Sequence, residues 1–561
     1  MATGKALNGK PYAGNPHVAP SQCYGGTGRF DEGEVASCTA EASLRRVPSR
    51  RQPEAMTRPQ VASRSEVARG LRASVCAATP RRGSLLYKTM AVAVASVVVA
   101  FALFIAAASA FASDQGVETE SGAPFTVTAG GRAVAVQEIS TPVVWLKGRD
   151  AQPYWYAQFD SSSPVEVRVK ARAGVDRLQV LPKKAAIRTM RTGDDEVAFT
   201  LAPSCQVAVE PNGRHRALVI AANLPETDVP DAKDPNVVFV QPGRHRRNLK
   251  LASNQTLYLA PGAVLEGSVC GAGTNITIRG RGAISGLCWG HYKGPGGRMV
   301  HPGGFVHPGG HVVHLEGSQI TVRDIMIVGA WSWCLVLDKT DRVLVDNVKI
   351  LGGHVINDDG IDICRSSDVT IRNSFIRAQD DTIAPKWWCE NLLVEKCILW
   401  TDAANAFRVG YECLPENGRG FRNLVFRDID VLHLSLHKNK PETFWANCAI
   451  FIQPSNATAF ENLLFDDIRF DSVERGDIFL NIKTQSIVGT LTRSKEAGRL
   501  RGCTLRNIHI ANPFDAETMR VHLEAADAAH PIEGVVFDDV TGYGRVSAVR
   551  TSAPSPRPHR Q

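Results

Sequence analysis

From about residue 250 to residue 545, the chain repeats one short pattern of polar and apolar positions. A polar turn residue is followed by mostly apolar residues, a polar pair and an alternating stretch, which predicts two short β-strands in each unit. Eight such units begin at Gln319, Arg342, Asp368, Asn391, Asn423, Asn462, Gly502 and Gly534. The early intervals are 23, 26 and 23 residues and the later ones 32, 39, 40 and 32 residues, which indicates loops inserted into later units.

A unit of this length cannot bury its apolar face alone, so consecutive units are expected to stack. Leucine-rich repeats have a similar period, but the leucine ladder with its fixed Asn is missing here. The pattern therefore predicts an all-β protein with a right-handed parallel β-helix over residues 246–548, whose coils lie about 4.8 Å apart. Residues 549–561 are expected to form a disordered C-terminal tail.

Residues 120–245 show a different pattern of alternation. Strand-like stretches such as 165–173 and 205–211 alternate between apolar and polar residues and are joined by turn-rich segments. We expect these residues to form a small β-sandwich domain that packs on the N-terminal end of the β-helix.

The first part of the chain shows no repeat. Residues 1–89 are rich in Gly, Ala, Ser, Pro and Arg, which predicts a disordered basic tail. Residues 90–112 then form a run of 23 residues without a charge, long enough for one transmembrane helix. Basic residues precede this run and acidic residues follow it, so the tail is expected in the cytoplasm and the remainder across the membrane.

Two interpretations of residues 90–112 stay open. A signal anchor would make a single-pass type II membrane protein with a lumenal or extracellular globular part. A signal peptide would give a secreted protein, because Ala110-Phe111-Ala112 fits a small-x-small cleavage site.

The charge of the chain is concentrated in the tail. The 64 basic and 56 acidic residues leave a net charge of +8, but residues 1–89 hold 14 basic and 6 acidic residues and account for all of it. Because the remaining 50 basic and 50 acidic residues balance, a nucleic-acid partner is not expected. Ten of the 13 cysteines follow residue 112, where an oxidising compartment permits disulfides. We expect a monomer.

The densest cluster of acidic residues falls on two neighbouring units. Asp358, Asp359 and Asp362 lie in the first unit, and Asp380 and Asp381 lie in the second. Asp359 and Asp381 are 22 residues apart, close to one repeat, so we expect them side by side on one face of the stack.

Carboxylates at such close range cannot all stay ionised without support, so at least one pKa should be raised. Glycoside hydrolysis uses this arrangement: a protonated carboxyl gives its proton to the leaving oxygen, while an ionised one activates water or attacks the sugar. Asp and Asn are also common at tight turns, which is how we interpret Asp341 and Asp368. The two motifs one unit apart are interpreted as a catalytic site.

These motifs resemble those of a known enzyme family. Asn357-Asp-Asp-Gly-Ile-Asp-Ile and Gln379-Asp-Asp resemble the Asn-x-Asp-Gly and Gln/Gly-Asp-Asp motifs of the polygalacturonases, glycoside hydrolase family 28. The stretches that begin at Leu251 and Gly280 are similar to the β-helix entry of the related dextranase and isopullulanase family, which places a β-sandwich before the helix. The resemblance covers roughly residues 120–545.

The resemblance implies a pectin-lyase-like β-helix that hydrolyses O-glycosidic bonds of a polysaccharide with inversion at the anomeric carbon. It also implies that Asp380 is the general acid and that Asp359 and Asp381 activate water. No organic cofactor and no metal are expected.

The sequence departs from the family pattern in two places. Asn405 stands where the polygalacturonases have the His of a Gly-His-Gly motif. Asn481-Ile-Lys483 aligns best with the family's Arg-Ile-Lys, so the Arg that binds the galacturonate carboxylate is absent. Arg408 is the candidate substitute, and a neutral glycan of the dextranase type is the alternative substrate.

Further substrate-binding residues are predicted around the carboxylates. Sugar rings present C–H faces that stack on aromatic planes, so at least one of Trp387 and Trp388 is expected at the substrate, whereas Trp333 and Trp400 fit the core. Four His between residues 301 and 314 match no standard zinc spacing and predict a loop beside the site. The predicted substrate-binding residues are Asn357, Gln379, Lys386, Trp387, Trp388, Asn405, Arg408, Tyr411 and Lys483.

Two other functional classes stay open. A polysaccharide lyase would hold Ca²⁺ with the five carboxylates, use Arg408 or Lys386 as its base, and release an unsaturated product. A non-catalytic glycan-binding β-helix would keep the aromatic residues and tolerate the loss of Asp380. Hydrolysis is preferred because the two acidic motifs occur in order at the spacing of one unit.

Overall fold

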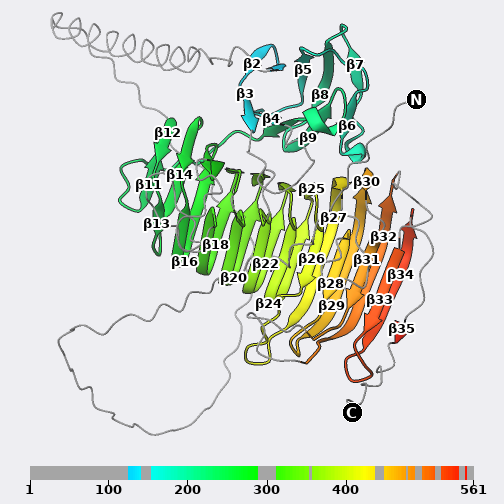
Figure 1. The fold of residues 1–561 in the computed structure, drawn as a ribbon. Coiled ribbons are helices and arrows are strands. Elements are labelled where there is room, and N and C mark those ends of the chain that lie inside the picture. The colour runs from blue at the N-terminus through cyan, green and yellow to red at the C-terminus, as the bar shows by residue number, and fades with distance from the viewer. Residues whose placement is uncertain are drawn as a thin grey trace, which may run out of the picture. The chain divides into compact units, whose positions relative to one another are not determined.

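The fold was analysed in a computed structural model (Figure 1). It describes residues 124–139, 153–287, 311–330, 332–352, 357–435, 448–475, 478–486, 496–511, 520–542 and 550–551. The predicted tail 1–89, the predicted membrane segment 90–112 and residues 552–561 lie outside these ranges. Within these ranges, no helix is both long and apolar enough to cross a membrane. The only helices described are two 3-10 turns, Lys183–Ala185 and Arg214–Arg216.

Residues 125–223 form a β-sandwich of two five-stranded sheets. The strand orders are β2-β1-β5-β8-β7 and β3-β4-β10-β9-β6. Val167 and Val169 of β5 share one apolar core with Leu218 and Ile220 of β10, so the two sheets face each other. The strands are β1 Phe125–Ala129, β2 Arg132–Val134, β3 Val136–Ile139, β4 Tyr154–Asp160, β5 Val165–Ala171, β6 Gln179–Leu181, β7 Thr189–Arg191, β8 Glu196–Leu201, β9 Cys205–Glu210 and β10 Leu218–Asn223.

The following strands, β11 to β35, form one continuous 25-stranded arrangement in which successive coils pair in parallel. Ile361 of β22 pairs with Ile383 of β24 one coil further on, for example. The prediction of an all-β protein with a parallel β-helix is therefore confirmed. The helix begins with β11 at Val237, before the predicted boundary at residue 246.

The strands of this β-helix are β11 Val237–Val240, β12 Gly243–Arg246, β13 Leu249–Leu251, β14 Thr256–Leu259, β15 Ala263–Glu266, β16 Val269–Gly280, β17 Ala283–Ser285, β18 Val313–Arg323, β19 Met326–Val328, β20 Leu335–Asp346, β21 Lys349–Leu351, β22 Ile361–Arg372, β23 Phe375–Ala378, β24 Ile383–Glu395, β25 Ile398–Thr401, β26 Phe407–Gly410, β27 Phe421–Ser435, β28 Ile450–Gln453, β29 Ala459–Phe470, β30 Val473–Arg475, β31 Ile478–Lys483, β32 Arg499–Ile510, β33 Arg520–Ala525, β34 Ile532–Thr541 and β35 Arg550–Thr551. Because β35 belongs to the helix, Arg550 and Thr551 are not part of a tail, and the remainder of the predicted tail at 549–561 lies outside the described residues.

Each coil contributes to three parallel sheets, and the long strands bend around a corner from the first sheet to the second. The site sheet contains the first halves of β16, β18, β20, β22 and β24, together with β13, β26, β28, β31, β33 and β35. The ladder sheet contains the second halves, with β11, β14, β27, β29, β32 and β34. The third sheet contains β12, β15, β17, β19, β21, β23, β25, the end of β27, and β30.

The polar residue that opens each sequence repeat lies at the corner between the site sheet and the ladder sheet. These corner residues have φ angles from 53° to 57° at Gln319, Arg342, Asp368, Asn391, Asn423 and Asn462. Asn tolerates this left-handed conformation better than most residues. Its side chains also stack: Asn423 Nδ2 donates to Asn391 Oδ1 at 2.9 Å. The repeat seen in the sequence is therefore the repeat of this corner.

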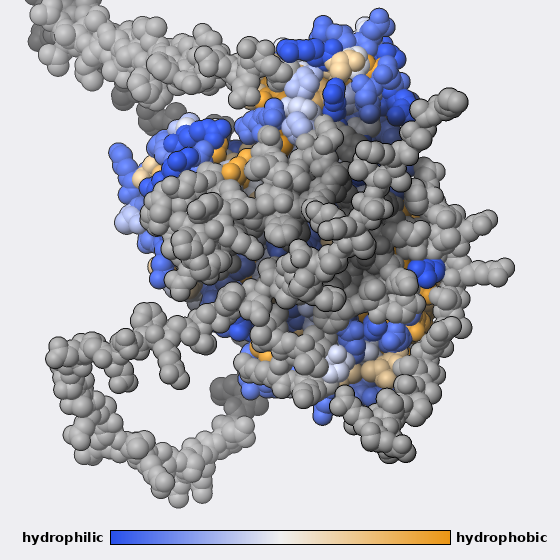
Figure 2. Space-filling model, viewed as in Figure 1, coloured by the Kyte–Doolittle hydropathy of each residue, from blue (hydrophilic) through white to orange (hydrophobic). Residues whose placement is uncertain are grey.

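The interior of the helix is filled by the apolar residues that alternate with outward-facing ones, including the stacked rings of Phe426 and Phe465, 4.7 Å apart. The described surface is mainly hydrophilic (Figure 2). In the described ranges, large apolar side chains are strongly exposed only at Met190, Leu224, Val229 and Val536. All nine described cysteines are unpaired, and seven of them are buried.

The sandwich packs along the side of the β-helix, and the expectation that it packs on the N-terminal end is wrong. The outer face of its second sheet, including Tyr154 and Tyr156, shares an apolar cluster with Leu351, Phe375 and Trp400 of the third sheet. Figure 1 shows the sandwich beside the middle coils. The reason is that β4 and β10 carry apolar residues at consecutive positions, so both faces of their sheet are apolar. One face packs against the first sheet of the sandwich, and the other needs a second apolar partner.

Candidate active site

The predicted acidic motifs lie in the turns that lead into the site sheet. Asp358 and Asp359 precede β22, and Asp380 and Asp381 precede β24. The Gly360 N–H donates to the Asp381 carbonyl oxygen at 2.8 Å, so the two turns stack directly. One carboxylate oxygen each of Asp359, Asp380 and Asp381 lies within 4.8 Å of the others.

Asp380 is the carboxyl with the least compensation. Its Oδ2 accepts the backbone N–H of Asn357 at 3.1 Å, and its Oδ1 accepts the N–H of Asp381 at 3.1 Å. Burial, followed by the carboxylates of Asp359 and Asp381, raises the pKa of Asp380 well above its usual value. Within the trio of Asp359, Asp380 and Asp381, this carboxyl is therefore a candidate to carry a proton at neutral pH.

Asp358 holds the turn that presents Asp380. It is fully buried, and its Oδ1 accepts the backbone N–H groups of Gln379 at 2.8 Å and Asp380 at 3.0 Å. Burial raises the pKa of Asp358 as well. Asp358 thus fixes the backbone of the second acidic motif from one coil below.

Asp359 is paired with a buried lysine. Its Oδ2 lies 2.9 Å from Nζ of Lys386, and both side chains are almost completely buried. Burial raises the pKa of Asp359 to about 6, and the nearby ammonium of Lys386 opposes that rise. Asp359 is therefore ionised more readily than Asp380, so the two carboxyls differ in protonation.

Asp381 is held by Asn405, the residue that replaces the family's His. Asn405 Nδ2 donates to Asp381 Oδ1 at 2.6 Å, and the Asn405 backbone N–H donates to the same oxygen at 3.2 Å. The Asn405 Oδ1 accepts the N–H of Cys448 at 2.8 Å. Because both ends of the amide are used, its orientation is fixed and Asp381 is held in one position.

Arg408 lies on β26 with only 4% of its surface exposed. Its guanidinium carbon lies 4.1 Å from the ring centroid of Phe451 and 4.9 Å from that of Tyr411, and its Nη2 donates to Gln453 Oε1 at 2.6 Å. Across the residues that the structure describes, no carboxylate lies within 4.0 Å of this guanidinium. The guanidinium is thus buried against two aromatic rings without a carboxylate partner among the described residues.

Three other predicted substrate-binding residues are partly exposed and already have partners in the chain. Lys483 Nζ already contacts Glu524 Oε2 at 3.3 Å. Trp387 packs in a small cluster with Trp333, under the guanidinium of Arg365 at 4.5 Å. Arg419 lies 4.8 Å from the ring centroid of Trp388. Each of the two adjacent tryptophans thus makes a cation–π contact with an arginine of this chain.

Glu412 is the site residue that the sequence did not reveal. It is 7% exposed, and its Oε2 lies 3.4 Å from Nζ of Lys386. An acidic residue two positions after Gly410, in an otherwise uncharged stretch, is the signal that was available. The long insertion in the following coil breaks the repeat, so its position on the stack could not be counted.

Two groups of side chains are compact enough to share a metal ion. One is the trio of Asp359, Asp380 and Asp381. The other contains His314, Glu316 and Asp338, but Arg365 already donates to both oxygens of Asp338. The second group therefore lacks the free charge that would favour a cation.

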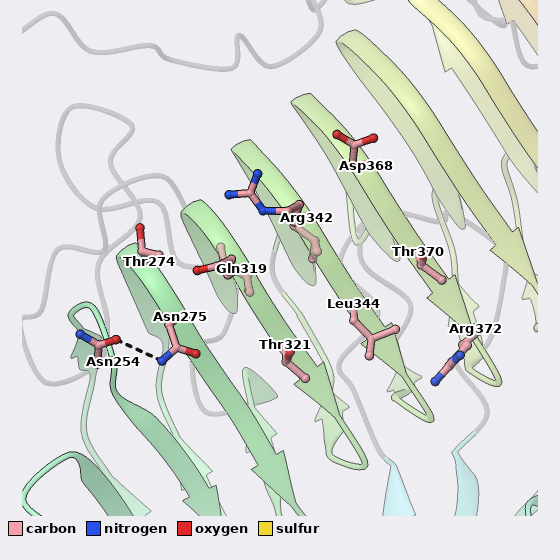
Figure 3. Close-up of a pocket in the computed structure, with 12 residues that line it drawn as sticks. Asn254, Thr274, Asn275, Gln319, Thr321, Arg342, Leu344, Asp368, Thr370 and Arg372 are labelled. Carbon is pink, nitrogen blue, oxygen red and sulfur yellow. Dashed lines mark hydrogen bonds between the residues drawn. The ribbon is translucent and has the colours of Figure 1, made fainter. Parts of the chain in front are cut away.

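An open depression lies on a different face, over the ladder sheet (Figure 3). Its floor carries Thr321, Leu344 and Thr370 from successive coils, and the Asn254–Asn275 ladder contact lies at one end. Its single carboxylate, Asp368, belongs to a corner. This surface lacks the grouped acids that glycoside chemistry requires.

The parallel β-helix carries grouped carboxylates on adjacent coils, which is the arrangement that glycoside hydrolysis uses. Residues 269–401 match the family model described as "Glycosyl hydrolases family 28". This match contains both acidic motifs and confirms the resemblance to the polygalacturonase family. It ends before Asn405 and Arg408, where the sequence departs from the family pattern.

One curated relative and two solved structures add to this comparison. A "Putative galacturan 1,4-alpha-galacturonidase A" of Aspergillus niger is 30% identical over 107 residues, which are 17% of this chain and 24% of that protein. The aligned region thus spans about a quarter of the relative's length.

Dex49A from Penicillium minioluteum has a TM-score of 0.54 at 14% identity, covering 77% of this chain and 91% of that one. The β-helix strands lie between residues 237 and 551, which is a smaller part of the chain than the 77% that is covered, so the likeness in fold extends to the sandwich. The exopolygalacturonase of Thermotoga maritima has a TM-score of 0.41 at 15% identity, covering 54% of this chain and 78% of that one.

Proposed function

We propose that this protein is a glycoside hydrolase that cleaves O-glycosidic bonds of a polysaccharide in a polygalacturonase-like manner. The observation that carries the proposal is the trio of Asp359, Asp380 and Asp381, whose oxygens lie within 4.8 Å of one another on adjacent coils. Their surroundings differ, which separates a proton donor from proton acceptors. We also propose that the coils of the β-helix wind in the right-handed sense.

In this proposal Asp380 is the general acid, because no cation contacts it among the described residues and its pKa is raised well above its usual value. Its proton passes to the glycosidic oxygen as the bond to the anomeric carbon breaks. A water molecule attacks that carbon and gives its proton to the Asp359 and Asp381 pair. Lys386 and Asn405 hold these two acceptors in place.

The family resemblance and the spacing of the carboxylates predict different stereochemistry at the anomeric carbon. The family resemblance implies inversion, whereas carboxylates as close as these are more typical of retaining enzymes. We retain inversion, because Asp359 and Asp381 form a pair of acceptors beside the acid and can share one water. The first-formed product should have the anomeric configuration opposite to the substrate, and proton NMR of early product reads it directly. Retained configuration would reassign one of the pair as a nucleophile.

The proposed substrate is an acidic polysaccharide with galacturonate units. The name of the Aspergillus niger relative supports this, and so does Arg408, whose buried guanidinium has no carboxylate partner in the described ranges. Bidentate pairing with a sugar carboxylate would satisfy it. A neutral glycan is the second candidate, because Asn481 stands at the family's Arg position and Lys483 is paired with Glu524.

The location of the protein is also a proposal. The uncharged run at 90–112 supports passage of the β-helix across a membrane, as a type II anchored or a secreted monomer. Alkaline extraction of membranes separates the two forms, since an anchored chain stays with the lipid and a secreted chain does not.

Reducing-sugar release by the full chain, measured with EDTA on polygalacturonate and on dextran, tests the activity. Release from polygalacturonate supports the acidic substrate, and release from dextran alone supports the neutral one. An unsaturated product that requires calcium would instead show a lyase. Binding without any turnover would show a non-catalytic glycan-binding protein.

A further inference from the structure

Lys386 occupies a position that substrate binding does not explain. It lies at the end of the site-sheet part of β24, just before Trp387, whose φ of 62° turns the chain around the corner. Its Nζ lies 2.9 Å from Asp359 Oδ2, 2.9 Å from Asp362 Oδ1 and 3.4 Å from Glu412 Oε2. The ammonium is therefore enclosed by carboxylates of this chain, and the prediction that it binds substrate is replaced.

An aromatic ring closes the remaining side of the ammonium. Nζ lies 3.7 Å from the ring centroid of Trp333, a distance typical of a cation–π contact. His311 stacks on Trp333 with ring centroids 5.0 Å apart and an interplanar angle of 23°. With Trp333 only 6% exposed, water has little access to Lys386.

The charges around Lys386 are unequal. Asp359, Asp362 and Glu412 contact it, and Asp358, Asp380 and Asp381 lie on the same two turns, so three carboxyl groups contact one ammonium and three more lie nearby. Further titratable groups interact with these acids in the described ranges: the thiols of Cys334, Cys364 and Cys448, the phenol of Tyr154 and the carboxylate of Asp402. Burial alone would lower the pKa of Lys386, but the carboxylates keep it well above its usual value.

Because Lys386 contacts Asp359 and does not contact Asp380, it affects the two carboxyls unequally. A fixed positive charge at 2.9 Å favours the ionised form of Asp359. No salt bridge to Asp380 is present in the described ranges, so of these two carboxyls Asp380 is the one that holds a proton more readily. Without the ammonium, Asp359 and Asp380 would both be buried acids facing other acids, with little to distinguish them.

We propose that Lys386 is a positioning residue that decides which carboxyl of the site carries the proton, by holding Asp359 ionised and turned toward the reacting water. Glu412 and Asp362 form its counter-charges and fix the ammonium in place. This inference rests on the proposed hydrolase function, in which Asp359 accepts a proton and Asp380 gives one.

The experiment compares the pH profiles of kcat and kcat/KM for the full chain and the variants Lys386→Met, Lys386→Arg and Glu412→Gln. Lys386→Met should lower kcat about 10²-fold, leave KM within about twofold, and move the acidic limb up by about one pH unit or more. Lys386→Arg keeps the charge and should keep the limb near its original pH. Lys250→Met, an exposed lysine of β13 on the first coils, is the matched control and should change nothing.

Glu412→Gln should move the acidic limb the opposite way, to lower pH, because it removes a negative charge that opposes ionisation of Asp359. This second variant keeps the test valid if Lys386→Met does not fold. A limb that stays in place in both variants, or moves in the same direction in both, would overturn the inference. If the unaltered chain hydrolyses no glycan, the proposed function fails instead, and the two failures are thereby distinguished.

Discussion

At the scale of single residues, the site separates chemically identical side chains by their contacts. Asp358 accepts two backbone N–H groups and holds a turn, whereas Asp359 faces an ammonium and Asp381 faces an amide. Asp380 accepts backbone N–H groups and has no cation beside it among the described contacts. Four aspartates on two adjacent coils thus have four different sets of contacts.

Replacing Asp380 by Asn removes the proposed proton donor while keeping the shape of the side chain. Turnover should fall about 10²–10⁴-fold, the contribution typical of a general acid. The melting temperature should stay the same or rise, because one buried acid is lost from a crowded group. Initial rates and thermal melts measure both effects.

The matched control is Asp341→Asn, which alters an exposed carboxyl at a corner of the neighbouring coil. This variant should keep full activity. Full activity in Asp380→Asn, by contrast, would remove the acid from the mechanism.

The sequence made part of this site predictable. Asp359 and Asp381 could be placed side by side because the regular 22-residue spacing survives between β22 and β24. The role of Lys386 could not be predicted. Sequence spacing shows that a residue lies on the site sheet, but it does not show which charged side chains surround that residue. Glu412 was missed because an insertion precedes the next coil and breaks the count.

At the scale of the elements, the coil is defined by its corners. Asn423 holds the left-handed conformation with φ of 56°, donates to Asn391 and accepts from Asn462 Nδ2 at 3.2 Å. Its side chain thus links three coils, while its backbone makes the bend. These two contributions can be separated by mutation.

Asn423→Gly should lose only the ladder hydrogen bonds, at a cost of about 1 kcal/mol, because Gly adopts the left-handed conformation freely. Asn423→Ala should cost about 1 kcal/mol more, because its Cβ is disfavoured there. Thermal melts should therefore rank the native protein first, Gly second and Ala last.

Asn417, an exposed left-handed residue of a loop with φ of 52°, provides the control outside the ladder. There, Gly should be nearly neutral and only Ala should destabilise. Equal effects of Gly at both positions would show that the ladder hydrogen bonds contribute nothing.

At the scale of the whole chain, the repeat made the parallel β-helix predictable, and the alternating strands made the sandwich predictable. The packing of the sandwich against the β-helix was not predictable. In the sequence, β4 and β10 have the apolar composition of ordinary core strands, and nothing marks their outer face as a contact surface. The contact that joins the sandwich to the β-helix contains a buried histidine. His433 of β27 is 3% exposed and lies beneath Trp400, with ring centroids 4.3 Å apart.

His433 bridges the two domains through carboxylates. Its Nε2 lies 2.5 Å from Oε1 of Glu210 in the sandwich, and its Nδ1 contacts Glu474 in the helix, which Arg214 of the sandwich also contacts. Burial alone would lower the pKa of His433, but the two glutamates raise it above its ordinary value. A histidine with a raised folded pKa stabilises fully below its unfolded pKa of about 6.5, and this stabilisation disappears as pH rises through the folded pKa.

The variant His433→Gln keeps polar atoms near both carboxylates but cannot carry the charge. Since Glu210 is completely buried, losing its partner should cost about 3 kcal/mol at pH 6. The difference between native and variant melting temperatures should be largest at pH 6 and shrink steadily toward pH 9. His509→Gln, an exposed histidine of β32 that contacts Thr541, should show no such trend. Parallel melting curves for the native protein and His433→Gln across this range would mean that His433 is neutral, and the charge would then play no part in joining the sandwich to the β-helix.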